Sequence, residues 1–279
     1  MIPRKPRRFL DRPLSVLRCF NPNNLELTAN EISDNTGLPK TTTHRILAEL
    51  IEDRLLEKNS RTKKYRIGPE LYILGSLYLS ATDVLQVAEP VTQTLNDLTG
   101  ETILMGIFDN GVIVITLKEE SRHAFRYARH VGSTLPAYAS AMGKAFLSEM
   151  SEQELDILYP EETLKPIAPK TITTKSELKR SLEEIRKNGV SYTREEGYTG
   201  DEAVAWLVRD ATNKAVAAMT IAVPLNMGEE RRVWLTGLVK LGCSLISYRL
   251  GYLNSAVTVR DISEIRSWAE QNEPKATEK

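Results

Sequence analysis

The side chains best suited to chemistry in this sequence are amino, hydroxyl, imidazole and guanidinium groups in a short segment that begins at Lys40. Groups of these kinds reach the phosphates and base edges of a DNA major groove. At helical spacing they lie opposite an apolar face that includes Ile46, Leu47 and Leu50. The segment therefore predicts a helix that reads DNA. Its expected contact residues are Lys40, Thr41, Thr42, His44 and Arg45.

A second helix and a tight turn are expected immediately before this segment. Thr28 and Glu31 have the spacing of a capping box, which starts a helix, and Ile32 is its apolar anchor. Gly37 offers the positive φ that the end of a helix requires, and Pro39 suits the start of the next helix. Two short helices joined by a glycine-containing turn form a helix-turn-helix.

A basic hairpin is expected after the two helices. Residues 57–65 contain the tip NSRTKK, and two short strands around it would form a wing along the DNA backbone. The expected wing contacts are Arg61, Lys63 and Lys64. Each helix alone is equally explained by a small apolar core with solvated charges. The joint order of cap, glycine turn, polar face and basic hairpin favours DNA binding.

Charge is unevenly distributed along the 279 residues. The formal net charge is zero, yet residues 1–66 contain 14 Lys and Arg against 8 Asp and Glu. A basic first part and an acidic remainder fit nucleic acid at one end and a different partner at the other. Residues 1–12 are rich in Arg, Lys and Pro and are expected to form an arm. This arm either enters a minor groove of DNA or only keeps the N-terminus in solvent.

Two segments carry a resemblance to a known family. GLPKTTTHRIL spans the turn and the predicted reading helix, and YRIGPELYILG leaves the wing. Both are similar to the DNA-binding half of the IclR family of bacterial transcriptional regulators. The resemblance implies an α+β chain with an N-terminal winged helix-turn-helix, a linker helix and a C-terminal GAF-like antiparallel sheet flanked by helices. It also implies two partners, double-stranded operator DNA and a small-molecule effector.

The resemblance and the element pattern together divide the chain into four parts. These are a winged helix-turn-helix domain at residues 1–68, a linker helix at 69–82, an effector-binding domain at 83–256 and a C-terminal tail at 257–279. A lone connecting helix has little core of its own, so its apolar stripe is expected to be buried between the subunits of a homodimer or a dimer of dimers. The stripe consists of Leu71, Leu74, Leu77 and Tyr78.

Alternating apolar patterns in the second half predict strands in hairpins with helices outside them. Asn110-Gly111 is a strong hairpin signal, and Pro90 should kink or divide the helix expected at residues 83–99. Strands are expected at residues 102–108, 112–118, 124–129, 190–194, 203–209 and 215–223. Helices are expected at residues 14–20, 139–150, 151–159, 174–188 and 232–254, and the tail is expected to be frayed from about residue 270.

A loop that runs into a helix at residues 132–144, GSTLPAYASAMGK, is the candidate ligand site. Small side chains let a carboxylate approach the N–H groups at the start of a helix. They also allow close packing of a helix on a sheet, and the residues alone leave both explanations open. In the family, the backbone N–H groups at the positions of Ala141 and Met142 hold an acidic effector, which implies the same role here.

The family signature near the pocket is matched with departures. Ala203 stands at a position that is often Cys, Thr193 at one that is Asp or Ser, and Thr220 and Ala222 at two serine positions. A pocket with fewer hydrogen-bonding groups favours a less polar carboxylate, aromatic or branched. Tyr138 and Trp206 are also nearby in the pattern. The expected effector contacts are Tyr127, Ala141, Met142, Thr193, Ala203, Thr220 and Ala222.

Catalysis has weaker support than binding, and no catalytic residue, metal or cofactor is expected. Glu195 and Glu196 are adjacent and would point to opposite faces of a strand, while Ser140 and His130 lack a readable third partner. Two rival functions remain open. One is an enzyme that acts on a small organic acid with an accessory DNA-binding domain, and the other is a constitutive DNA-binding dimer without an effector.

The expected location is the cytoplasm, with no membrane partner. No apolar run reaches the length of a membrane span, and no signal-peptide core follows the basic N-terminus. Cys19 and Cys243 lie in apolar helical patterns, which predicts buried thiols in a reducing compartment.

Overall fold

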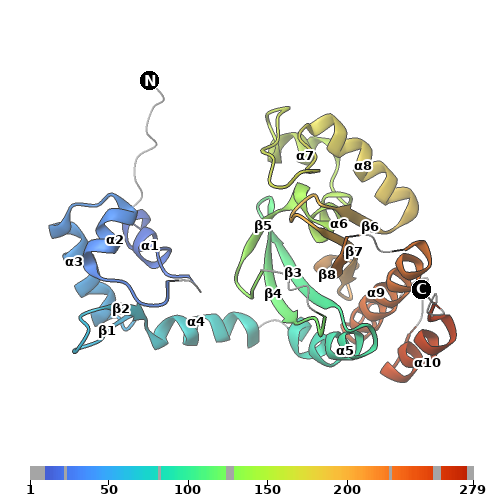
Figure 1. Cartoon of the computed structure of the whole chain (residues 1–279), viewed down its shortest axis with the longest axis horizontal. Coiled ribbons are helices and arrows are strands. Elements are labelled where there is room, and N and C mark those ends of the chain that lie inside the picture. The colour runs from blue at the N-terminus through green and yellow to red at the C-terminus, as the bar shows by residue number, and fades with distance from the viewer. Residues whose placement is uncertain are drawn as a thin grey trace. The chain divides into compact units, whose positions relative to one another are not determined.

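The computed structural model describes residues 10–21, 24–80, 83–123, 129–225, 228–253 and 259–274. The chain divides into two units, Met1–Thr82 and Asp83–Lys279 (Figure 1). Tyr127 and most of the strand expected at residues 124–129 lie outside the described residues. Within the described part of the chain, no helix has both the length and the apolar character needed to cross a membrane.

The first unit is a helix-turn-helix with a two-stranded wing. Its elements are α1 (Asp11–Leu17), α2 (Ala29–Thr36), α3 (Lys40–Glu52), β1 (Leu56–Lys58), β2 (Tyr65–Ile67) and α4 (Pro69–Ser80). The predicted capping box of Thr28 and Glu31 starts α2, and Gly37 ends it with a φ of 65°. Ile32, Ile46 and Leu47 form the centre of a small apolar core. The sequence prediction of this unit is therefore confirmed, although α1 begins three residues earlier than expected.

The second unit contains one antiparallel sheet with the strand order β5-β4-β3-β8-β7-β6. The strands are β3 (Thr102–Asp109), β4 (Val112–Glu119), β5 (Thr134–Pro136), β6 (Ser191–Arg194), β7 (Asp201–Arg209) and β8 (Ala215–Pro224). Asn110 and Gly111 both have positive φ, as the predicted tight hairpin between β3 and β4 requires. The predicted α+β fold class is confirmed, and β5 is a strand that the sequence reading missed.

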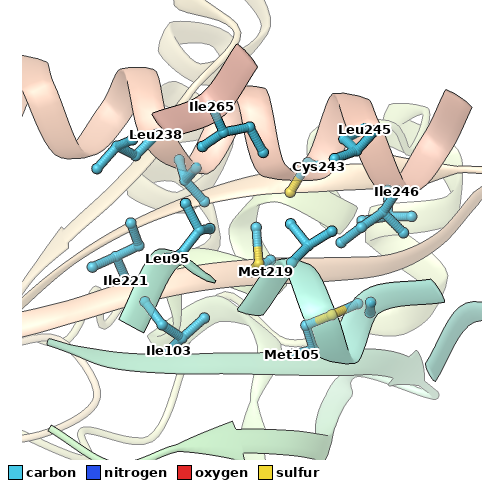
Figure 2. Close-up of a cluster of buried hydrophobic side chains, with 14 of the residues drawn as sticks. Leu95, Ile103, Met105, Met219, Ile221, Leu238, Cys243, Leu245, Ile246 and Ile265 are labelled. Atoms are coloured by element: carbon cyan, nitrogen blue, oxygen red, sulfur yellow. The ribbon is translucent and has the colours of Figure 1, made fainter. Parts of the chain in front are cut away.

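Two long helices cover one face of this sheet. α5 (Asp83–Thr99) and α9 (Glu229–Arg249) pack on β3, β7 and β8 through the largest apolar core of the chain. Figure 2 shows this core, with Leu95 from α5, Met219 from β8 and Cys243 from α9. Pro90 does not divide α5, because the helix is continuous from residue 83 to residue 99. Its buried face, which includes Val91 and Leu95, packs into the core and holds the helix together across the proline.

The opposite face of the sheet is covered by shorter elements. They are the 3-10 turn η1 (Ala137–Ala139), α6 (Ala141–Leu147), α7 (Glu152–Leu158) and α8 (Lys175–Asn188). The helix expected at residues 139–150 is present as α6, but it is shorter at both ends. Ser140 precedes it in an extended conformation, and its side chain caps the helix by accepting a hydrogen bond from the N–H of Gly143 at 2.9 Å.

The segment expected as a C-terminal tail contains a packed helix, α10 (Ile262–Asn272). Asp261 caps it, and Ile265 and Ala269 are buried against the unit's core. The indole N–H of Trp234 donates to the carbonyl of Ala269 at 3.2 Å. The prediction of a tail is thus wrong for residues 262–272, which form a packed helix. The preceding helix, α9, ends at Arg249 rather than at residue 254. Cys243 is buried as predicted, whereas Cys19 is only half-buried.

Two glycines let η1 lie directly against its neighbours. A Cβ added to Gly143 in α6 would lie 2.2 Å from the carbonyl oxygen of Ala137, and one added to Gly197 would lie 2.4 Å from that of Ala139. Both obstacles are backbone atoms, so relief requires a movement of η1 itself. The start of α6 is therefore held over the sheet by contacts that only glycine permits.

Replacing Gly143 by Ala should lower the free energy of unfolding by about 1–3 kcal/mol, because the new methyl group forces η1 and α6 apart. An exposed helical Gly→Ala change normally stabilises by up to about 1 kcal/mol. Gly75→Ala in α4, where a Cβ would meet nothing within 4 Å, is the matched control. Chemical denaturation measures both variants, and equal or greater stability of Gly143→Ala would contradict the close packing.

Candidate nucleic-acid interface and effector pocket

The predicted reading residues lie together on the solvent side of α3. Its buried side consists of Thr43, Ile46, Leu47 and Leu50, as predicted. Lys40, Thr41, His44 and Arg45 are exposed, and Thr42 is half-buried. Arg45 forms an ion pair with Glu49 at 3.0 Å, one turn further along the helix. Since both side chains are mostly exposed, this pair contributes little to stability and can be exchanged for a DNA contact.

The wing tip is shaped by Asn59. Its side-chain oxygen accepts hydrogen bonds from the N–H groups of Arg61 and Thr62, and its own N–H donates to the carbonyl of Lys64. Lys63 has a φ of 59°, in the left-handed region. Arg61 and Lys63 are exposed and Lys64 is half-buried. Arg66, in contrast, is paired with Glu57 at 2.7 Å across the hairpin. The wing therefore carries three cationic side chains at its tip.

The helix that leaves the wing exposes apolar side chains. In α4, Tyr72, Ile73 and Leu74 are 79%, 42% and 51% exposed. Leu71 is half-buried, while the side chains of Leu77 and Tyr78 lie outside the described part of the chain. Exposed apolar side chains grouped on one helix are typical of a surface that contacts a partner.

In the second unit, a small cavity lies between the start of α6 and the sheet. It has a volume of about 20 Å³, roughly the room that one water molecule needs. Six of the seven predicted effector residues line it, and the seventh, Tyr127, lies outside the described residues. The six are Ala141, Met142, Thr193, Ala203, Thr220 and Ala222.

Sheet register explains why these residues meet. Thr193 on β6 pairs with Ala203 on β7, which pairs with Ala222 on β8. Directly paired residues of antiparallel strands point to the same face, so the three side chains form one row below α6. The two alanines leave the space that becomes the cavity. A larger side chain at either position would fill it.

The start of α6 supplies N–H groups above this row. Ala141 and Met142 are the first two residues of the helix, whose initial N–H groups have no partner within the helix. Ser140 also lines the cavity. The hydroxyl of Thr220, however, donates to the carbonyl of Val204 at 2.8 Å, so its hydrogen is already used. Thr220 can offer a ligand only an acceptor.

Two charged residues of the cavity were missed by the sequence reading. Asp201, at the start of β7, is 3% exposed, and its Oδ1 has no hydrogen-bond partner among the described residues. Burial raises the pKa of Asp201 to about 7, and the negative charge of Glu196 adds to the rise. Arg129 lines the same cavity, half-buried, and its positive charge opposes that rise. Asp201 is two positions from Ala203, so strand alternation could have identified it.

A buried ion pair lies next to this cavity. Lys144 on α6 is 2% exposed, and its Nζ lies 2.8 Å from Oε1 of Glu196. Burial raises the pKa of Glu196, although Lys144 works against the rise. Glu195 instead pairs with Lys170 at 3.1 Å and has a φ of 53°. These two glutamates follow β6 in a loop and are not strand residues, contrary to expectation. Each is held by its own lysine, an arrangement that serves structure.

The aromatic residues expected near the pocket lie elsewhere. Trp206 belongs to the sheet face that packs on α9, and the hydroxyl of Tyr138 donates to the carbonyl of Lys165 at 2.8 Å. Trp206 borders a separate cavity of about 160 Å³ below α6 and α8. The arginines of that cavity are already engaged, since Arg186 donates to the carbonyls of Ser148 and Met150, and Arg209 pairs with Glu149. The cavity under the start of α6 is the better ligand site.

Asp201→Asn should flatten the pH dependence of stability. In the unfolded chain Asp ionises near pH 4, whereas in the folded chain Asp201 keeps its proton to about pH 7. The folded state therefore binds more protons in this window, and its stability falls as pH rises from about 4 to 7, by up to about 1.4 kcal/mol per pH unit. The asparagine variant loses the contribution of Asp201 to the pH dependence of stability. The contribution of Glu196 remains.

Thermal unfolding of the wild type and the variant between pH 4.5 and 7.5 measures the difference. Asp109→Asn, at the exposed end of β3, is the control and should keep the wild-type slope. The assignment fails if Asp201→Asn and the wild type have parallel pH profiles.

Comparison with known proteins relates both sites to one family. Residues 10–60 match the IclR helix-turn-helix domain, and residues 76–248 match the C-terminal domain of bacterial transcriptional regulator IclR. The chain is 30% identical over 251 residues to the HTH-type transcriptional repressor AllR of Escherichia coli K12, covering 90% of this chain and 93% of the relative. It is 28% identical over 226 residues to the transcriptional repressor IclR of the same organism, covering 80% and 82%.

A solved structure has the same fold. An IclR homolog complexed with 4-hydroxybenzoate, from Microbacterium hydrocarbonoxydans, superposes with a TM-score of 0.77 at 22% sequence identity, covering 87% of this chain and 99% of that one. The two domain matches together extend from the first helix of the reading unit to α9. The chain therefore belongs to the IclR family of bacterial transcriptional regulators and carries that family's helix-turn-helix DNA-binding domain.

Proposed function

We propose that this protein is a repressor whose binding to operator DNA is modulated by a small-molecule carboxylate. The observation that carries the proposal is the exposed row of Lys40, Thr41, His44 and Arg45 on a helix whose other side is buried. Such a helix is rigid and presents side chains suited to base edges. Two relatives, the transcriptional repressors IclR and AllR, support repression rather than activation.

Each part of the chain has a role in this proposal. Residues 1–68 bind DNA, residues 69–82 link, and residues 83–256 bind the effector, with α10 as an added support of the last part. Base contacts come from Lys40, Thr41, Thr42, His44 and Arg45, and phosphate contacts come from Arg61, Lys63 and Lys64. The protein acts in the cytoplasm, where operator DNA is found, and it is not an enzyme.

The effector binds under the start of α6. Support comes from the cavity itself, in which the N–H groups of Ala141 and Met142, the guanidinium of Arg129 and the small side chains of Ala203 and Ala222 converge. The homolog solved with 4-hydroxybenzoate supports an aromatic acid as one candidate. A cavity of about 20 Å³ is too small for such a molecule, so the ligand selects an opened pocket. The ligand binds the open pocket more tightly than the closed one, and this difference in binding free energy shifts the protein between its two states.

Subunits associate through α4. Exposed Tyr72, Ile73 and Leu74 support this arrangement. A symmetric dimer, or a dimer of dimers, would present two α3 helices to half-sites spaced by whole turns of DNA, roughly 34–36 Å apart.

A footprint on the DNA upstream of the chain's own gene, repeated with a panel of carboxylic acids, tests the function as a whole. Protection of a two-fold symmetric site that is altered by one acid is the expected result. Protection that no acid alters would favour the constitutive DNA-binding dimer. Turnover of an acid by the purified protein would favour the enzyme.

Arg45→Ala should weaken specific operator binding by about 1–3 kcal/mol, because it removes a base-edge contact. Lys63→Asn should weaken binding to all sequences alike and lower the salt slope by about one phosphate contact. Asn tolerates the positive φ at this position, so the wing keeps its shape. Fluorescence anisotropy at several salt concentrations measures both effects. Arg180→Ala, an exposed arginine on α8, is the control, and wild-type affinity of Arg45→Ala would refute the assigned face.

Replacing Leu74 and Leu77 by Glu should dissociate the protein into monomers and abolish operator binding, because charges at the proposed interface lose their hydration on association. Sedimentation velocity measures the association state. Ile157→Glu, on the exposed side of α7, is the control and should leave that state unchanged. An intact dimer in the double variant would place the interface elsewhere.

A further inference from the structure

The candidate effector cavity contains a buried acidic group with one oxygen that the described residues do not satisfy. Asp201 is 3% exposed, its side chain lines the cavity, and its Oδ1 accepts no hydrogen bond from the described residues. Unpaired buried carboxylate oxygens are unfavourable, and native proteins contain few of them. A group of this kind that faces a cavity is explained if a ligand satisfies it.

The same cavity contains a positive charge that is not paired with Asp201. One N–H of the Arg129 guanidinium donates to the carbonyl of Thr134 at 3.3 Å, which leaves further donors on the group. Among the described residues no ion pair joins Arg129 to Asp201, although the arginine is near enough to lower the pKa of the aspartate. The cavity therefore presents one group that binds anions and one that accepts hydrogen bonds, and no ion pair among the described residues joins the two.

The remaining walls restrict what can lie between these two charges. Leu104, Ile115 and Leu135 are apolar, and Ala203 and Ala222 add only methyl groups. A carboxylate placed against Asp201 would meet a like charge or require a shared proton, whereas Arg129 and the N–H groups of Ala141 and Met142 favour it. The opposite end of the ligand then faces Asp201 and gains most by donating a hydrogen bond to it.

We infer that the effector is a carboxylate that also carries a hydroxyl or amino donor, with Arg129 binding the carboxylate and Asp201 accepting the donor. This inference rests on the proposed function, because it assigns the ligand class of the same pocket. It adds a second polar recognition point to a pocket whose sequence suggested few polar groups. It also assigns specificity to a residue outside the six predicted contacts that line the cavity.

Two sets of matched acids test the inference on the full-length protein by calorimetry. Propionate, lactate and pyruvate differ at one position that carries no polar group, a hydroxyl donor or a carbonyl acceptor, and benzoate and 4-hydroxybenzoate differ by one phenolic hydroxyl. In at least one set, the donor-bearing acid should bind the wild type at least tenfold more tightly than the others. Asp201→Leu should remove this preference, and Arg129→Gln should weaken all members of the set by a similar factor. Asp109→Asn is the control and should behave as the wild type.

Three outcomes would overturn the inference. They are the absence of a donor preference in both sets of acids, persistence of the preference in Asp201→Leu, and failure of every acid to bind. Operator binding measured in parallel separates these outcomes from a failure of the proposed function. If an acid without a donor binds and alters operator affinity, the proposed function as a regulator is supported and only the inferred ligand class is wrong. If no acid binds but operator DNA does, the effector role of the pocket fails as well.

Discussion

The candidate ligand pocket depends on backbone segments that touch without side chains between them. η1 lies against Gly143 of α6 on one side and Gly197 on the other, at distances that leave no room for a methyl group. This contact sets how close the first residues of α6 come to the sheet. Only then do Ala203 and Ala222, small residues in adjacent strands, leave a cavity under the first residues of α6. The small residues of this region therefore allow close packing and also leave a cavity, so the two explanations that the sequence left open are compatible.

Around this contact the protein buries charged side chains. Lys144 and Glu196 form a nearly buried ion pair, and such pairs cost desolvation energy that their attraction only partly offsets. The pair ties α6 to the loop that follows β6, next to Asp201 at the start of β7. Burial of apolar side chains on the opposite face of the sheet offsets this desolvation cost. There α5, α9 and α10 bury the largest apolar core. The candidate ligand cavity and the largest apolar core thus occupy opposite faces of one sheet.

The sequence predicted what local signals control. The capping box of Thr28 and Glu31, the turn at Gly37 and the Asn110-Gly111 hairpin each depend on a few neighbouring residues, and all three are present as expected. Residues brought together by register or by loops were harder to predict. Arg129 stands two positions after Tyr127 in the strand expected at residues 124–129, so alternation could have pointed to it. Strand parity was also readable in the sheet. If Ala203 faces the pocket, Asp201 must face it too and Trp206 cannot. α10 was also readable, from Asp261 and the apolar spacing of Ile262, Ile265 and Ala269, but its many charges suggested a tail.

The packing of α10 has a consequence for how the second unit is isolated. The ring of Trp268 occupies the place where Gly237 of α9 lacks a side chain, and Ile265 and Ala269 are buried in the same core. The domain match to the family ends at residue 248, before this helix begins. A fragment cut at that point would leave a groove along α9 open to solvent, with Trp234 at its edge and the hydrogen bond to Ala269 lost. Fragments of the second unit intended for crystallisation or ligand screening should therefore extend through residue 272. Shorter fragments would expose an apolar patch that is prone to aggregation and that α10 covers in the whole chain.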